Sequence, residues 1–166
     1  PILTHIPGLK VVVPSCPYDA KGLLIQAIRD DDPVVFLENK LLYDMQGEVP
    51  DRAYTIPFAE ANVLREGGDV LLIALGRMVQ VASEAAEQLA REGIDCTVLD
   101  PRTTSPLDEE SIIEAATRCR RVVVVDESSP RCGLAVDIAA LVGEHAFDAL
   151  MAPVLKVTPP HTPVPY

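Results

Sequence analysis

Short apolar runs that alternate with helix-length amphipathic segments constrain this chain's fold more than any other feature. Two of these runs, 70–75 and 122–125, are strand-sized, and the segment 79–91 between them carries an apolar face with helical spacing. Strands that alternate with helices of about 10–15 residues are typical of a mainly parallel sheet covered by helices on both faces. The sequence therefore predicts an α/β fold.

The same pattern predicts where the elements lie. Residues 9–38 read as one strand–helix–strand unit, whose two strands are expected to be parallel with a right-handed crossover. Residues 39–59 are expected to be a linker, because proline and glycine interrupt them. Residues 60–166 are expected to form a domain with a five-stranded sheet. Predicted helices are 19–30, 79–91, a segment from about 105 to 118, and 134–144.

Composition excludes several classes of function. Asp and Glu number 25 against 14 Lys and Arg, a formal net charge of -11, which argues against a nucleic-acid partner and against binding to an anionic membrane surface. The chain has no apolar run of about 18 residues and no secretory signal, and its four cysteines form no CxxC pair. A cytoplasmic protein with reduced thiols is expected. The glycine patterns of dinucleotide and phosphate loops are missing as well.

Two acidic groups are candidate binding sites, each with a plainer alternative. Asp30, Asp31 and Asp32 follow the first predicted helix, where unpaired carbonyls and carboxylates could hold a hard cation or simply form a solvated turn. Glu144 and Asp148 are four residues apart, so a continuous helix would place them on one face. That face could bind a basic partner or be ordinary surface.

Several stretches resemble the beta subunit of thiamine-dependent 2-oxo acid dehydrogenases, in the same order along nearly the whole chain. They include HIPGLKVV (5–12), PYDAKGLL (17–24), PVVFLE (33–38), RTTSPLD (102–108) and TPVPY (162–166). Local variants such as KLLY (40–43), PRC (130–132) and PHTPVP (160–165) are most similar to the acetoin dehydrogenase branch.

The resemblance implies a specific architecture and activity. Residues 1–38 would be the end of a pyrimidine-binding domain, and 60–166 a transketolase C-terminal-like domain lacking its final helix. The family's enzymes use thiamine diphosphate and Mg²⁺ in an α2β2 heterotetramer, cleave acetoin or decarboxylate a 2-oxo acid, and pass the acyl group to a lipoyl-bearing acyltransferase core. The family's cofactor-activating glutamate and active-site histidine would lie before Pro1, so no catalytic or cofactor-binding residue is expected within this segment. The segment alone is expected to be inactive and to be a piece of a longer protein.

The resemblance also implies two sites. Potassium would be bound by carbonyls of Ala27, Ile28 and Asp30 together with Asp32, which stands where the family often has asparagine. Glu144 and Asp148 would contribute to an acidic surface for the acyltransferase. Three alternatives stay open: a pyruvate or branched-chain 2-oxo acid dehydrogenase beta subunit, a single-chain transketolase or deoxyxylulose phosphate synthase, and a stand-alone α/β interaction module.

Overall fold

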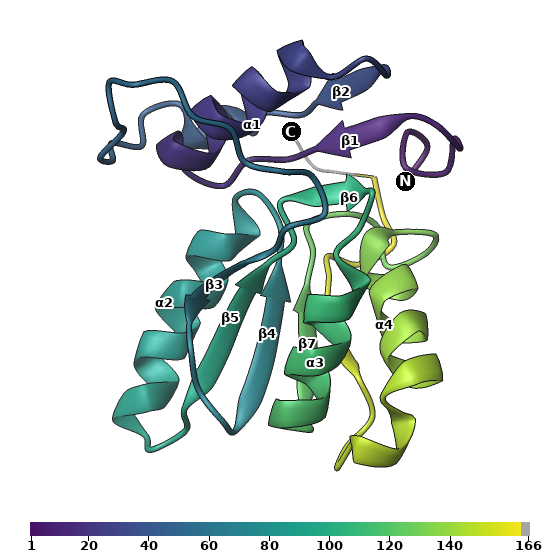
Figure 1. Cartoon of the computed structure of the whole chain (residues 1–166). Coiled ribbons are helices and arrows are strands. Elements are labelled where there is room, and N and C mark those ends of the chain that lie inside the picture. The colour runs from purple at the N-terminus through teal and green to yellow at the C-terminus, as the bar shows by residue number, and fades with distance from the viewer. Residues whose placement is uncertain (164–166) are drawn as a thin grey trace.

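The computed structural model describes residues 1–163 and contains two sheets, one above the other in Figure 1. The larger sheet has the strand order β3-β5-β4-β7-β8. Its strands are β3 (Asn62–Arg65), β4 (Val70–Ala74), β5 (Cys96–Asp100), β7 (Val122–Val125) and β8 (Leu155–Val157). Four of them are parallel, and β3 runs antiparallel to β5 at one edge. The predicted α/β fold with a five-stranded, mainly parallel sheet is confirmed.

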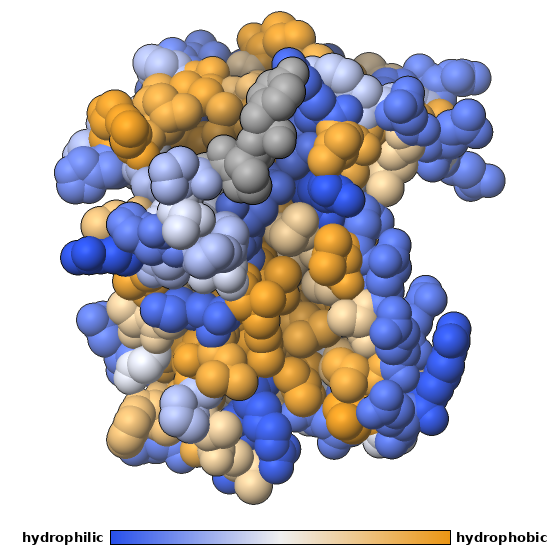
Figure 2. All heavy atoms as spheres, turned by 180° about the vertical axis from the view of Figure 1, so that it is seen from behind, coloured by the Kyte–Doolittle hydropathy of each residue, from blue (hydrophilic) through white to orange (hydrophobic). Residues whose placement is uncertain are grey.

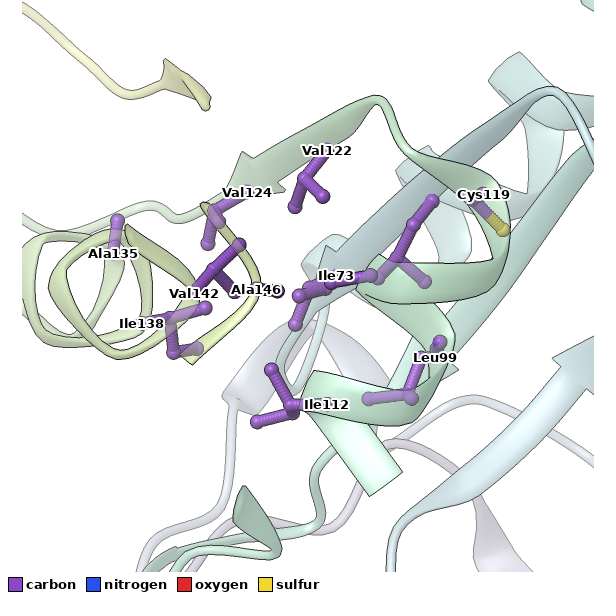
Figure 3. Close-up of a cluster of buried hydrophobic side chains, with 13 residues drawn as sticks. Ile73, Leu99, Ile112, Cys119, Val122, Val124, Ala135, Ile138, Val142 and Ala146 are labelled. Carbon is purple, nitrogen blue, oxygen red and sulfur yellow. The ribbon is translucent and has the colours of Figure 1, made fainter. Parts of the chain in front are cut away.

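Helices cover the two faces of this sheet unequally. Its helices are α2 (Met78–Arg91), α3 (Glu109–Cys119) and α4 (Leu134–His145), and a 3₁₀ turn η2 (Phe147–Ala149) follows. Leu71 and Ile73 of β4 face α3 and α4, whereas Leu72 faces α2, because successive side chains of a strand point to opposite sides. Figure 3 shows the first of these two cores, in which Ile138 and Val142 of α4 pack toward Val124.

The side of β8 that faces α2 is open. Leu155 and Val157 pair with Val123 and Val125 of β7, yet they are 61% and 57% exposed. Seen from behind, the C-terminal domain shows gathered apolar side chains (Figure 2). Parallel sheets normally have both faces covered. This face therefore has the character of an interaction surface.

The smaller sheet has the strand order β2-β1-β6, so it combines two strands from the start of the chain with one from much later in the sequence. It contains β1 (Lys10–Val12), β2 (Val34–Phe36) and β6 (Thr103–Ser105), and α1 (Pro17–Arg29) connects the first two. β1 and β2 are parallel, as predicted, but β6 pairs antiparallel with β1 from about ninety residues further along the chain. The N-terminal unit (residues 1–38) and the C-terminal domain (from residue 60) therefore share a sheet.

The third helix begins at the later of the two possible caps, Ser105 and Asp108, that the sequence offers. Its N-cap is Asp108, whose carboxylate accepts a hydrogen bond from the Ser111 amide at 3.0 Å, so α3 starts at Glu109 rather than near Ser105. Ser105 belongs instead to β6, where its hydroxyl donates to the Leu9 carbonyl at 2.9 Å. The segment before the cap therefore contacts the N-terminal unit instead of forming the first turn of the helix.

The linker (residues 39–59) packs on α1 after a short 3₁₀ turn, η1 (Lys40–Leu42). The Tyr54 ring stacks on Tyr18 with centroids 4.6 Å apart, and Ile56 is buried. A Cβ atom on Gly22 would lie 2.7 Å from both Tyr54 and Ile56, so only glycine fits there. The linker is thus fixed to the N-terminal unit. Within residues 1–163, no helix combines the length and the apolar character that crossing a bilayer requires.

Candidate functional site

The acidic turn at the end of α1 is organised by a lysine. Lys10 Nζ, from β1, lies 2.6 Å from Asp30 Oδ1 and 3.0 Å from Asp32 Oδ2. Asp30 Oδ1 also accepts the Asp32 amide at 3.0 Å, which closes the turn. Hydrogen bonding to Asp30, then to Asp32, raises the pKa of Lys10, and the bond from Lys10 lowers the pKa of Asp30. The turn is therefore an ion-paired cluster rather than the freely solvated acidic turn considered above.

Two of the predicted potassium ligands, Asp30 and Asp32, belong to this cluster, and the other two precede it. Ala27 and Ile28 are in the last turn of α1, where helix geometry leaves carbonyl oxygens without an amide donor from the same helix. Asp30 is the C-cap with an extended backbone, and Asp32 follows it. Among residues 1–163 no group of three or more His, Cys, Asp or Glu side chains is arranged to hold a metal ion. A cation site here would therefore depend on backbone carbonyl oxygens, which are suitable ligands for a hard cation.

Glu144 and Asp148 do not share a helix face, so that expectation is wrong. α4 ends at His145, and Asp148 lies in η2 after a break at Ala146, whose side chain is buried. At the break Ala146 leaves helical geometry, with φ -126° and ψ 10°, and its side chain belongs to the core between the sheet and α3 and α4. Both acidic side chains are exposed, and between them in sequence Phe147 is 71% exposed.

A buried polar cluster joins the N-terminal unit to the C-terminal domain. This junction cluster consists of Ser15, Asp19, Asp100 and Arg102, each less than a tenth exposed. Arg102 Nη2 donates to Asp19 Oδ1 of α1 at 2.7 Å, and the Arg102 amide donates to Asp100 Oδ1 at 2.8 Å. Arg102 has φ +60°, and its carbonyl accepts the Val13 amide at 2.9 Å. Its backbone and side chain both bridge the junction.

Asp100 is the most perturbed acid of the junction cluster. Burial, followed by the negative charge of Asp19, raises its pKa to about 6. The neighbouring Ser15 hydroxyl, the Arg102 amide and the Arg102 charge act in the opposite direction without cancelling the burial effect. Asp100 therefore titrates close to neutral pH.

A cleft of about 800 Å³ lies between the two units. Glu38, Asn39 and Thr104 line one side of it, and Asp126 and Glu127, at the carboxyl end of β7, line another. Asn39 Nδ2 donates to Glu127 Oε1 at 2.8 Å across the cleft, and the Tyr43 hydroxyl donates to Glu38 Oε2 at 3.0 Å. Glu38, the carboxylate that follows the second strand, is thus held by a neighbouring tyrosine.

Sequence reasoning missed the junction cluster. Asp19 could only be assigned to the start of a helix, and Arg102 was part of a motif that carried the resemblance, without a role. The position of Asp100 was the one usable indication of this cluster. It is the last residue of a buried strand, and functional side chains often gather at the carboxyl ends of parallel strands. Pairing it with Ser15 and Asp19, some eighty residues earlier, required the tertiary structure.

Comparison with protein families matches residues 59–166 to "Transketolase, C-terminal domain" and residues 1–46 to "Transketolase, pyrimidine binding domain". A solved structure described as "Split gene transketolase, inactive beta4 tetramer" superposes with a TM-score of 0.78 at 28% identity, covering 95% of this chain and 50% of that one.

The curated relatives are beta subunits named as oxidoreductases or dehydrogenases. The beta subunit of acetoin:2,6-dichlorophenolindophenol oxidoreductase is 58% identical in Cupriavidus necator, over 100% of this chain and 49% of that protein. Its Bacillus subtilis counterpart is 55% identical, over 99% of this chain and 48% of that protein. The pyruvate dehydrogenase E1 component subunit beta of Bacillus subtilis is 48% identical, over 99% of this chain and 51% of that protein.

This chain spans about half the length of the curated relatives that it matches. The matched residues cover both units of the structure, and the larger match coincides with the five-stranded sheet and its helices. The chain belongs to the transketolase C-terminal domain family and carries part of a transketolase-type pyrimidine-binding domain before it.

Proposed function

We propose that this chain is part of the beta subunit of a thiamine diphosphate-dependent acetoin dehydrogenase component. The observation that carries this proposal is the identity of 58% and 55% to two acetoin oxidoreductase beta subunits along essentially the whole chain, against 48% to a pyruvate dehydrogenase counterpart. The subunit acts within a complex that cleaves acetoin and transfers the acyl group to lipoamide. Within it, this segment serves assembly and partner binding.

A pyruvate or branched-chain 2-oxo acid dehydrogenase beta subunit is the alternative. The 2-oxoisovalerate dehydrogenase subunit beta of Bacillus subtilis is 45% identical over 99% of this chain. Sequence identity to the acetoin relative is about ten percentage points higher than identity to the relatives of either alternative, which favours the acetoin assignment. A single-chain transketolase is less well supported, since the transketolase structure shares 28% identity.

Assembly with an alpha subunit into an α2β2 heterotetramer is part of the proposal. The open apolar face of β7 and β8 supports it, because exposed apolar faces on soluble proteins mark interaction surfaces. The test is co-expression of the full-length beta protein with an alpha chain from the same organism, followed by purification through a tag on one chain. Recovery of both chains in equal amounts is expected. A beta protein that purifies alone and stays monomeric would support the stand-alone interaction module instead.

We propose that thiamine diphosphate and Mg²⁺ bind only in the complete complex. The family resemblance gives the cofactor's aminopyrimidine a glutamate that this segment does not include, and activation needs an acid–base group at that position. Glu38, the carboxylate nearest the second strand, is already bonded by Tyr43. Titration calorimetry of this 166-residue chain with thiamine diphosphate and Mg²⁺ is expected to give no heat of binding at micromolar concentrations. Micromolar affinity would place a cofactor site within this segment.

Potassium binding at the end of α1 is a further part of the proposal, with carbonyls of Ala27, Ile28 and Asp30 and the Asp32 side chain as ligands. The extended C-cap and the carbonyls in the last turn of α1 support it, and potassium would have to displace the Lys10 ammonium, which lies 3.0 Å from Asp32 Oδ2. Potassium at about 100 times its Kd is expected to stabilise the full-length protein by about 2.7 kcal/mol, measured as a higher unfolding temperature than in choline chloride. Asp32→Ala should reduce this difference and Asp31→Ala, at an exposed neighbour, should retain it. Identical stability in both salts would refute the site.

The acyltransferase contact is assigned to Glu144 and Asp148. Both are exposed beside the exposed Phe147, so a partner with a basic rim and an apolar centre fits this surface. Reversing both charges to Lys is expected to weaken acyltransferase binding about tenfold at low salt, with a smaller difference at high salt. Reversing Glu84 and Glu87, exposed on α2, makes the same change of charge elsewhere and should leave binding unchanged. Equal binding by both double variants would exclude this surface.

A cytoplasmic location is also proposed. The four cysteines are free thiols in the structure, with Cys96 and Cys119 buried, which fits a reducing compartment.

A further inference from the structure

The junction cluster is unusual in its charge balance. Two buried carboxylates, Asp19 and Asp100, face one buried arginine: the Arg102 guanidinium donates to Asp19, whereas the Arg102 backbone amide donates to Asp100, and the two aspartates come from opposite sides of the junction. Within residues 1–163, the Ser15 hydroxyl oxygen, the second carboxylate oxygen of each aspartate and Nε of Arg102 have no hydrogen-bond partner. A buried charge without a partner is costly, and a carboxyl group in that position is stabilised when it takes up a proton.

The cluster also controls the backbone that joins the two units. Asp100 holds the left-handed conformation of Arg102 through the Arg102 amide, and the next residue, Thr103, pairs with Val12 at the start of β6. The Arg102 carbonyl accepts the Val13 amide on the other side of the same contact. A change in the Asp100 charge therefore acts directly on the pairing of β1 with β6.

We propose that the junction cluster is a pH-dependent contact between the N-terminal unit and the C-terminal domain. With Asp100 protonated, the β1–β6 pairing is closed. Loss of the proton places a second negative charge opposite Asp19 across the junction, and the pairing opens more often. The contact thus adjusts how firmly the pyrimidine-type unit is held on the C-terminal domain.

The direction of the effect follows from the groups around Asp100. The charged groups that act on it are Asp19, from α1, and Arg102, from its own loop, while Ser15, before α1, contributes a hydroxyl. α2 contributes an amide, since Gln80 Nε2 donates to the Ser15 carbonyl at 3.0 Å. The folded-state pKa of about 6 lies above the ordinary 3.8. The stabilisation from the protonated form is therefore complete below about pH 3.8 and is lost as the pH rises through about 6.

The test is hydrogen–deuterium exchange of the full-length protein between pH 4.5 and pH 8, followed in peptides that contain β1 and β6. After correction for intrinsic exchange rates, the opening constant of these peptides is expected to rise with a midpoint near pH 6. Because the pKa of Asp100 is raised from 3.8 to about 6, the opening constant can rise by at most about 100-fold. Asp100→Asn, which keeps an acceptor for the Arg102 amide but cannot ionise, should remove the pH dependence. Asp44→Asn, at an exposed aspartate, should retain it.

A second variant tests the assignment of the titrating group. Because the Ser15 hydroxyl favours ionised Asp100, Ser15→Ala is expected to move the midpoint to higher pH. An opening constant of the wild-type peptides that does not change with pH would overturn the proposal, even if neither variant folds. So would a wild-type midpoint that persists in Asp100→Asn or stays fixed in Ser15→Ala.

Discussion

Asp19→Asn is expected to lower the free energy of unfolding by about 3–5 kcal/mol, because it leaves the buried guanidinium of Arg102 without its ionic partner. The pair is nearly excluded from water: the side chains of Asp19 and Arg102 are 1% and 10% exposed, and their closest atoms are 2.7 Å apart. Asparagine preserves the shape of the side chain, so lost charge pairing rather than lost packing would account for the change. Urea unfolding of the full-length protein measures it.

The matched control removes an exposed ion pair. Arg65 and Asp95 are 3.0 Å apart, but their side chains are 36% and 56% exposed. Asp95→Asn is expected to cost less than about 1 kcal/mol, since water screens such pairs. Equal effects of Asp19→Asn and Asp95→Asn would show that the junction pair does not hold the two units together.

Ile138→Ala is expected to destabilise the C-terminal domain by about 2–5 kcal/mol. Ile138 of α4 is 1% exposed and lies in the core against β7 (Figure 3), so the substitution leaves a cavity that the surrounding residues cannot fill completely. Because α4 leads into the segment with Glu144 and Asp148, the variant should also show faster exchange in peptides 134–149. Thermal unfolding and hydrogen exchange measure the two effects.

Ile28→Ala makes the same substitution at an exposed position. Ile28 is 76% exposed on α1, and only its carbonyl is assigned a role, so a change within about 0.5 kcal/mol is expected. A loss at Ile138 no larger than that at Ile28 would contradict the assignment of the core.

The sequence predicted the regular parts of this fold because their signals are local. Helix 79–91 corresponds to Met78–Arg91, and helix 134–144 to Leu134–His145, since each has an apolar face of helical period. Gly93, two residues after the first of these helices, has φ +84°, and its amide donates to the Ala90 carbonyl. The comparisons also confirm the resemblance to thiamine-dependent dehydrogenase beta subunits as one of sequence and domain type.

Elements that depend on distant partners could not be predicted. β6 has three residues and no alternating pattern, and it exists because β1 offers unpaired backbone groups. β3 is a four-residue strand just after the predicted linker, and only its antiparallel pairing with β5 makes it a strand. The shared helix face predicted for Glu144 and Asp148 is wrong because their spacing assumed a continuous helix, whereas α4 ends at His145 and Asp148 lies in η2.

The measurement that tests the central claim most directly is the activity of the full-length beta protein assembled with its alpha chain. The assay follows reduction of 2,6-dichlorophenolindophenol with thiamine diphosphate and Mg²⁺, and compares acetoin with pyruvate and with a branched-chain 2-oxo acid at equal concentration. A beta subunit of an acetoin dehydrogenase component predicts dye reduction that requires both chains and the cofactor, with kcat/KM highest for acetoin. Higher kcat/KM for either 2-oxo acid, or no reduction with any of the three substrates by a correctly assembled complex, would contradict it.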